Sequence, residues 1–165
     1  MPALPSITAP MWPLSIARML IGVLWLLALR WKLPPDFDGG SERGLREWLE
    51  LEVEHPTVAL YGSFIDSVVL RNFTAFAWAV FAVELVVGLA LLTGTVTRAA
   101  AFVGVLLSLN LGIGLAEVPG EWPWSYAMMA MWHGTLLVAG AGRLWGVDQY
   151  LRRHLDERSP IVSLT

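Results

Sequence analysis

The sequence contains no cysteine and only one lysine, Lys32. The absence of cysteine excludes disulfides, Cys-ligated zinc, iron–sulfur clusters and thiol redox chemistry within this chain. Charge is scarce as well, because charged residues make up 15% of the chain, against about 25% in typical soluble domains. The net charge of −3 leaves no basic surplus for a phosphate backbone, which argues against nucleic-acid binding. Any redox role would therefore need a bound small molecule or a partner subunit.

Apolar residues, in contrast, are abundant. They make up 56% of the 165 residues, and the mean hydropathy is +0.58. A chain of this length cannot bury so much apolar surface in its own core, because small domains keep a large exposed fraction. The excess is therefore expected to face lipid, which predicts an integral membrane protein.

Four segments are long and apolar enough to cross a bilayer, which takes roughly 20 residues. The predicted spans are about residues 12–31, 73–93, 98–117 and 124–142. Proline and glycine mark the breaks between them. The first segment lacks the basic start and the cleavage site of a signal peptide, so we expect it to be retained. The sequence thus predicts an all-α fold, a four-helix membrane bundle that forms a single domain over residues 1–165.

Four spans would place both termini on one side of the membrane. The count of Lys and Arg is five on each side, so the positive-inside rule is nearly neutral here. Arg98 in a short turn, and the cluster of Arg143, Arg152 and Arg153, favour termini in the cytoplasm and a tail over 143–165 that lies there. We accordingly expect a location in the inner (cytoplasmic) membrane. Tryptophans at the predicted span ends suit the headgroup level: Trp12, Trp31, Trp122, Trp124 and Trp145.

The loop over residues 34–70 is the largest piece outside the predicted spans, and we expect it to be extracytoplasmic. Ser41 can cap a helix there. An apolar face at helical spacing follows, which predicts a short amphipathic helix that Pro56 ends: Leu45, Trp48, Leu49 and Val53. A second, weaker apolar stretch over 58–69 predicts another surface helix. The loop is either a lid or docking platform, or a connector that packs on the bundle.

Ionisable residues at membrane depth are costly and are functional hypotheses by default. The predicted spans contain Arg18, Glu84 and His133, together with the weaker candidate Asn110. Counting residues from the turns places Arg18 and Glu84 at similar depth, which predicts a salt bridge between them. Small residues recur on the same helices and favour close packing: Gly22, Gly88, Ala100, Gly104, Ser108 and Gly112.

Two interpretations of these polar residues stay open. In the functional one, Glu84, His133 and Arg18 are catalytic residues of a pocket that holds a quinone head group. Aromatic and amide side chains would then contact the ring: Trp25, Phe81, Asn110 and Tyr126. In the structural one, the polar groups only hold the bundle together. A single histidine within the spans is a poor metal site, and two axial ligands for haem are not available there, so neither group is predicted.

Several segments resemble the DoxX/DoxD family of four-helix membrane proteins. The most specific is residues 84–100, from Glu84 through the Gly94 turn to Arg98 and Ala100. Further matches are Ala17-Arg18 with Gly22, and the segments 31–33, 107–110 and 140–148. The resemblance covers about residues 12–153, and the long loop is closer to the DoxD-like branch.

That branch includes the membrane subunit of thiosulfate:quinone oxidoreductase, which oxidises thiosulfate to tetrathionate, reduces a quinone and works with a second small subunit. The resemblance therefore implies a quinone-linked redox subunit that is in contact with lipid and has a second redox subunit or a second copy of itself as partner. A non-catalytic scaffold or assembly partner of a redox complex is the alternative. A small-solute transporter is a further one, for which dimerisation would have to supply the missing pathway.

Overall fold

The computed structural model describes residues 10–38, 40, 43–155 and 159–165. In this part of the chain the secondary structure is entirely helical, without a strand, as predicted. The helices are α1 (Trp12–Ala28), η1 (Leu29–Lys32), α2 (Leu45–Glu54), α3 (Ala59–Phe64), η2 (Ile65–Val69), η3 (Leu70–Asn72), α4 (Phe73–Thr93), α5 (Thr97–Leu115), α6 (Pro123–Ala139), η4 (Ala141–Arg143), α7 (Val147–His154) and α8 (Pro160–Ser163).

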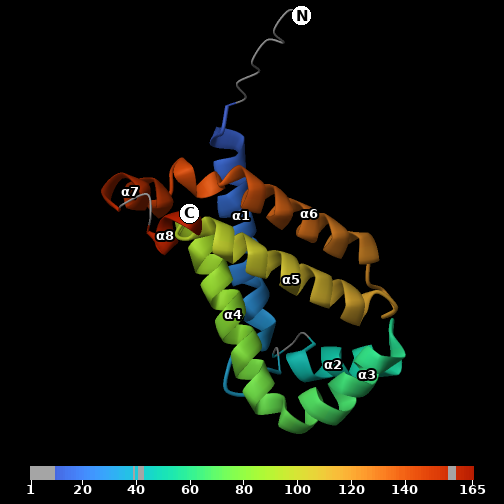
Figure 1. The fold of residues 1–165 in the computed structure, drawn as a ribbon. Helices are drawn as coiled ribbons and strands as arrows, with labels where there is room; N and C mark the ends of the chain where they lie inside the picture. Colours follow the sequence, from blue (N-terminus) through green and yellow to red (C-terminus); the bar gives the residue numbers. More distant parts are fainter. Residues whose placement is uncertain (1–9, 39, 41–42, 156–158) are drawn as a thin grey trace, which may run out of the picture.

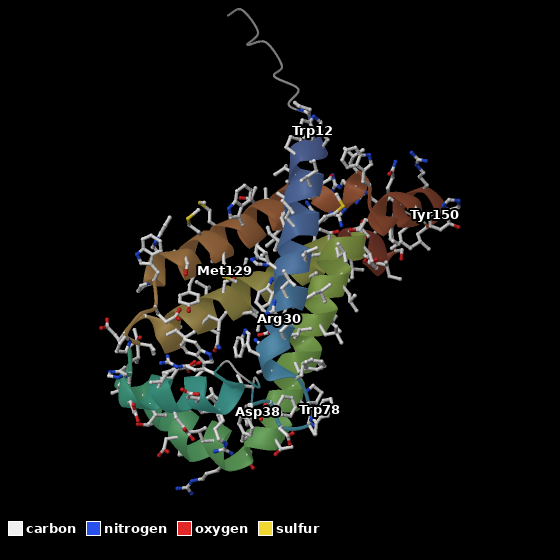
Figure 2. All side chains as sticks on the ribbon, turned by 180° about the vertical axis from the view of Figure 1, so that it is seen from behind. Trp12, Arg30, Asp38, Trp78, Met129 and Tyr150 are labelled. Carbon is white, nitrogen blue, oxygen red and sulfur yellow. The ribbon has the colours of Figure 1, made fainter. Side chains whose placement is uncertain are left out.

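The four long helices form two pairs that diverge. Helix α1 packs along α4, and α5 packs along α6. The pairs meet at the end of the molecule that also holds α7 and α8, and they separate toward α2 and α3 (Figure 1). We call the first end the terminal side and the second the loop side. The view from behind shows the same divergence, with α2 and α3 across the loop side (Figure 2).

Close approach within each pair depends on glycines, as the small-residue pattern predicted. A Cβ atom on Gly22 would lie 2.6 Å from the backbone nitrogen of Leu92, and one on Gly88 would lie 2.9 Å from the side chain of Leu26. On α5, a Cβ atom on Gly104 would lie 2.1 Å from the ring of His133. Only residues without a side chain allow these backbones and rings to come so near.

Helix ends coincide with the local signals in the sequence. Helix α4 ends at Gly94 and α6 ends at Gly140, and both glycines adopt the left-handed conformation common after a helix. Helices α1 and α6 have proline in their first turn, where its missing N–H is not needed. The predicted span 73–93 matches α4 at both ends.

Three helical segments are long and apolar enough to cross a membrane: Trp12–Lys32, Ala59–Thr93 and Thr97–Leu115. Their outward faces carry exposed apolar side chains such as Leu24, Val86 and Leu106, which suits contact with lipid. The fourth predicted span corresponds to α6, whose 17 residues lie at the lower end of the length that can span a bilayer. The protein is a helical membrane protein, and the count of four spans stays a prediction.

The amphipathic helix predicted in the loop is α2. Its face with Leu45, Trp48 and Leu49 turns toward the bundle, as expected. The predicted cap Ser41 lies outside the described residues. The second predicted loop helix is present as α3 and η2, and through η3 it runs on into α4. The loop is therefore a helical layer across the open end of the two pairs.

Candidate functional site

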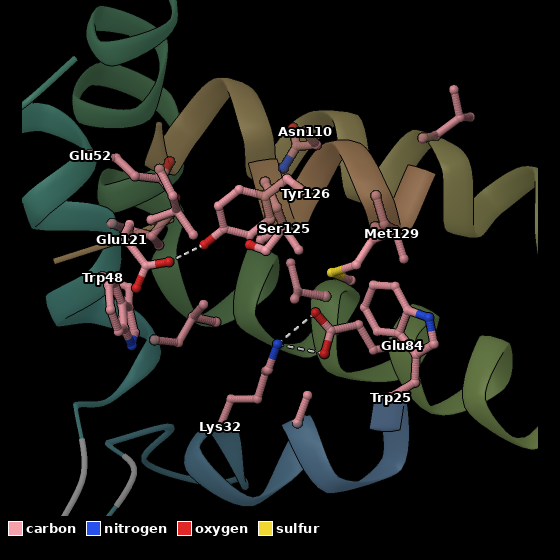
Figure 3. A pocket seen from close by; sticks show the side chains of 18 of the residues that line it. Trp25, Lys32, Trp48, Glu52, Glu84, Asn110, Glu121, Ser125, Tyr126 and Met129 are labelled. Atoms are coloured by element: carbon pink, nitrogen blue, oxygen red, sulfur yellow. Dashed lines mark hydrogen bonds and ion pairs between the residues drawn. The ribbon is translucent and has the colours of Figure 1, made fainter. Parts of the chain in front are cut away.

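The space between the diverging helix pairs is a cavity of about 1490 Å³. Its walls come from α1, α4, α5 and α6, and α2 and α3 line it on the loop side. The lining is mainly apolar and rich in tryptophan, with a few polar side chains that point inward (Figure 3). A concave apolar site with few polar groups is the usual form of a binding site for a small molecule.

The strongest polar feature of the cavity is an ion pair between Lys32 and Glu84. The Lys32 Nζ atom lies 2.6 Å from Oε1 and 2.5 Å from Oε2 of Glu84, and both side chains are only 3% exposed. The ammonium group also lies 4.1 Å from the centre of the Trp31 ring. Figure 3 shows the pair directed into the cavity beside Trp25. Glu84 was predicted to be a site residue, whereas the role of Lys32 as its partner was not predicted.

The predicted salt bridge between Arg18 and Glu84 is wrong. The contacts of Gly22 with Gly88 and Leu92 set the antiparallel register of α1 on α4, and that register brings Arg18 beside the Gly94 turn. Glu84 lies ten residues before that turn, a separation of about 15 Å along the helix. The guanidinium group cannot cover this distance. Lys32, at the end of the η1 segment that follows α1, lies close enough to reach Glu84.

Arg18 instead binds backbone carbonyls on the terminal side. Its Nη1 atom donates hydrogen bonds to the carbonyl oxygens of Leu91 and Leu92, the second at 3.1 Å, and Nη2 donates to that of Trp145 at 2.9 Å. These two leucine carbonyls belong to the last turn of α4, where a cation is favourable. Arg18 is fully buried and does not line the cavity.

Asp148 completes this cluster on the terminal side. Its carboxylate accepts hydrogen bonds from the backbone N–H groups of Val96 at 2.6 Å and Thr97 at 2.8 Å, at the start of α5. Its own N–H donates to the carbonyl of Gly94 at 2.8 Å. Val96 has a φ of 42°, a strained conformation for a β-branched residue. Three of the segments that carried the family resemblance, Ala17-Arg18, 84–100 and 140–148, therefore meet here and hold the α4–α5 turn.

His133 is buried between α1, α5 and α6. Its Nδ1 atom lies 2.7 Å from the carbonyl oxygen of Met129, and Trp25 Nε1 donates a hydrogen bond to its Nε2 atom at 2.9 Å. These partners require the neutral imidazole with the proton on Nδ1. Both ring nitrogens are thus engaged, and the histidine fixes the orientation of Trp25 in the cavity wall.

The predicted ring-binding residues fall in two places. Trp25, Asn110 and Tyr126 line the cavity, but Phe81 does not. Phe81 packs instead against the separate apolar cluster around Phe37, which joins the start of the loop to α4. Asn110 Oδ1 accepts a hydrogen bond from the Tyr61 hydroxyl at 3.1 Å, and the Tyr126 hydroxyl donates one to Glu121 Oε2.

Glu52 is the second cavity residue that the sequence analysis missed. It lies on the inner face of α2, 7% exposed, and its Oε2 atom has no hydrogen-bond partner. A Cβ atom on Gly114 of α5 would lie 2.6 Å from its carboxyl carbon. Burial raises its pKa from the ordinary value of 4.5 to about 7. Its spacing of four residues from Trp48 and three from Leu49 already placed it on the apolar face.

Comparison with known proteins gives one family. A family model described as the TQO small subunit DoxD matches residues 56–165, more than half of the chain. No curated protein and no solved structure matches the chain. The matched region begins after α2, so Lys32 and Glu52 lie before it, whereas Glu84, His133 and Asp148 lie within it.

Proposed function

Because the chain belongs to the DoxD family, we propose that it is the membrane subunit of a quinone-linked redox complex of the thiosulfate:quinone oxidoreductase type. In this proposal the cavity takes up a quinone from the lipid. Electrons would come from a partner subunit, since a chain without cysteine has no thiol chemistry of its own.

The observation that carries the proposal is the buried Lys32–Glu84 pair in the wall of a large apolar cavity. A quinone has a planar head with carbonyl oxygens and a long apolar tail. The volume of about 1490 Å³ exceeds the roughly 300–1,000 Å³ of ordinary ligand pockets, which leaves room for a head group and part of a tail. The residues present therefore fit such a ligand.

The roles of the residues follow from the hydrogen-bond donors and acceptors that the protein leaves unused. An ammonium group has three donors. Lys32 uses one of them for its hydrogen bond to Oε1 of Glu84, and Oε2 lies beside the ammonium group as an ion-pair contact. A further donor can then serve a carbonyl oxygen in the cavity. Glu84 keeps the ammonium group buried and charged, and it can hold a proton near the same place. Trp25, oriented by His133, offers a flat face to a ring. Quinone chemistry supplies two-electron reduction coupled to proton uptake.

Quinone binding by the purified chain tests this proposal. We expect Lys32→Gln to weaken the binding of a short-tailed ubiquinone analogue at least about tenfold, which corresponds to one charge-assisted hydrogen bond. Arg30→Gln is the matched control, because Arg30 is exposed, lies two residues earlier and does not line the cavity. The control should keep the affinity of the unmodified chain.

Equal affinity in the Lys32 variant and the unmodified chain would refute the assigned site. Absence of any quinone binding, together with stable co-purification of a redox partner, would favour the non-catalytic scaffold instead. Measuring quinone reduction in the isolated complex, with Lys32→Gln and Arg30→Gln side by side, would then separate a site that binds quinone from one that also turns it over.

A further inference from the structure

A second polar region of the cavity lies on the loop side, under α2. Its central group is Glu52, which is buried, with only 7% of its surface exposed. The Oε2 atom of this carboxyl has no partner among the described residues, although it lines the cavity. An unpartnered buried carboxyl oxygen in a cavity wall is costly unless a ligand supplies the missing contact.

The charges around the cavity leave this carboxyl uncompensated. Lys32 forms an ion pair with Glu84. Arg43, the other Lys or Arg residue of the lining, has its Nε atom 3.1 Å from the exposed Glu47. Glu121 accepts a hydrogen bond from the hydroxyl of Tyr126. In the described part of the chain, no cation is paired with Glu52, so this side of the cavity carries an excess of negative charge.

Aromatic rings line the cavity near the same carboxyl. Trp48 lies one helical turn before Glu52 on the same face of α2, and the guanidinium carbon of Arg43 lies 5.4 Å from the centre of its ring. Tyr61 and Tyr126 also line the cavity, and both interact electrostatically with Glu52. Their hydroxyl groups are committed to Asn110 and Glu121, which leaves the rings as contact surface. Aromatic faces beside a carboxylate attract desolvated organic cations, whose charge interacts with the ring quadrupoles.

We propose that the region around Glu52 is a binding site for a lipophilic organic cation, of the quaternary ammonium or phosphonium class. The charged centre would lie at the Glu52 carboxylate, beside the rings of Tyr61 and Tyr126, with the edge of the site formed by Trp48. Its apolar substituents would occupy the apolar part of the cavity. The cation would bind at a different carboxyl group from that of the Lys32–Glu84 pair, although in the same cavity, and the proposal does not depend on quinone binding.

Such a site has a defined pH dependence. Burial raises the pKa of Glu52 to about 7, so the empty site is mostly neutral in acid and charged in mild base. The titratable groups that face Glu52 from neighbouring elements are Tyr61 on α3 and Tyr126 on α6. Asp66 and Arg71, on the segments η2 and η3 that also pack on α2, are exposed. The affinity for a permanent cation should therefore rise as the pH passes through about 7.

Equilibrium dialysis of the purified chain in a neutral detergent, with empty micelles subtracted, tests the proposal. The probe is tetraphenylphosphonium, and tetraphenylborate is the control of the same shape and opposite charge. We expect the cation to bind about tenfold more tightly at about pH 8.5 than at about pH 5.5, and the anion to bind more weakly than the cation at the higher pH.

Two matched variants complete the test. Glu52→Gln should remove the pH-dependent gain, and Glu54→Gln, exposed on the same helix, should keep it. Glu121→Gln, a second variant at the same end of the cavity, should lower the affinity at about pH 8.5 without removing the pH dependence. Equal binding of the cation and the anion by the unmodified chain, or an unchanged pH profile in a folded Glu52→Gln protein, would overturn the proposal.

Discussion

Lys32 and Glu84 are 52 residues apart in the sequence, yet the Nζ atom of the lysine lies within 2.6 Å of both carboxylate oxygens of the glutamate. Each partner is 3% exposed. The pair joins the end of the first long helix to the middle of α4 at the wall of the cavity. Removing one charge leaves the other buried alone, which costs more than the pair itself contributes.

The pair predicts an asymmetry between single and double substitutions. Glu84→Gln should lower the free energy of unfolding by about 3–5 kcal/mol, because Lys32 is then buried without a counter-charge. The double variant Lys32→Met with Glu84→Leu should recover most of that loss. Thermal unfolding in detergent, followed by circular dichroism, measures both. Arg46→Gln, which removes an exposed pair with Glu50 at 3.8 Å, should change stability by less than about 1 kcal/mol. A double variant as unstable as Glu84→Gln would contradict this account.

The close contact between Gly104 and His133 predicts that a substitution of His133 partly rescues a substitution of Gly104. Gly104→Ala would place a methyl group 2.1 Å from Cδ2 of His133, so the ring must move and the hydrogen bond from Trp25 must lengthen or break. We expect a loss of about 1–3 kcal/mol in stability. Adding His133→Ala vacates the space and should restore part of the loss. Gly134→Ala, with no atom within 4 Å of the new Cβ, is the control on the neighbouring helix. If this control is destabilised as strongly as Gly104→Ala, helix packing in general is the cause.

Glu52 predicts a pH-dependent stability difference. Its pKa in the folded chain is raised by burial from 4.5 to about 7, so the folded state holds the proton more tightly than the unfolded state. The contribution of Glu52 to the free energy of unfolding therefore falls as the pH rises from about 4.5 to about 7, and it stays low above that. Glu52→Gln should be more stable than the unmodified chain at about pH 8, by about 3 kcal/mol.

The measurement for Glu52 is the thermal midpoint of both proteins at about pH 5 and about pH 8. The gap between them should widen with rising pH. Glu54→Gln, on the exposed face of α2, should follow the unmodified chain throughout. A gap that stays constant over this range would show that Glu52 does not titrate there.

Substitution of Arg18 should lower the stability of the protein without weakening ligand binding in the cavity. Arg18→Gln removes donors from the carbonyl groups of Leu91, Leu92 and Trp145, so we expect a loss of about 2–4 kcal/mol in stability. Because Arg18 does not line the cavity, the folded fraction should bind a quinone analogue within about twofold of the unmodified affinity. A large loss of affinity at unchanged stability would return Arg18 to the binding site, where the sequence analysis had placed it.

Asp148 predicts a weakened start of α5. Asp148→Ala leaves the N–H groups of Val96 and Thr97 without their acceptor, and we expect a loss of about 1–2 kcal/mol, as for other helix caps. Hydrogen exchange should accelerate first in the turn over residues 94–98. Asp36→Ala, at an exposed aspartate of the loop, is the control. Exchange that accelerates equally across all helices would argue for global rather than local opening.

Local patterns in the sequence determined the helices. Hydropathy placed α4 at residues 73–93 and located the other long helices to within a few residues, because long apolar runs and the glycines and prolines that end them act over a few neighbouring residues. The amphipathic spacing also identified α2. The structure begins that helix at Leu45 with Gly44 as its N-cap, and the predicted cap Ser41 lies outside the described residues.

The partners of the polar side chains were decided by tertiary structure alone. Glu84 pairs with Lys32 rather than Arg18 because the contacts of Gly22 with Gly88 and Leu92 set the register of α1 against α4. Phe81 turns away from the cavity, while Glu52 is brought into it when α2 lies across the diverging helix pairs. A sequence shows which residues cannot face lipid cheaply, but a shift of one helical turn between two packed helices changes which of those residues meet.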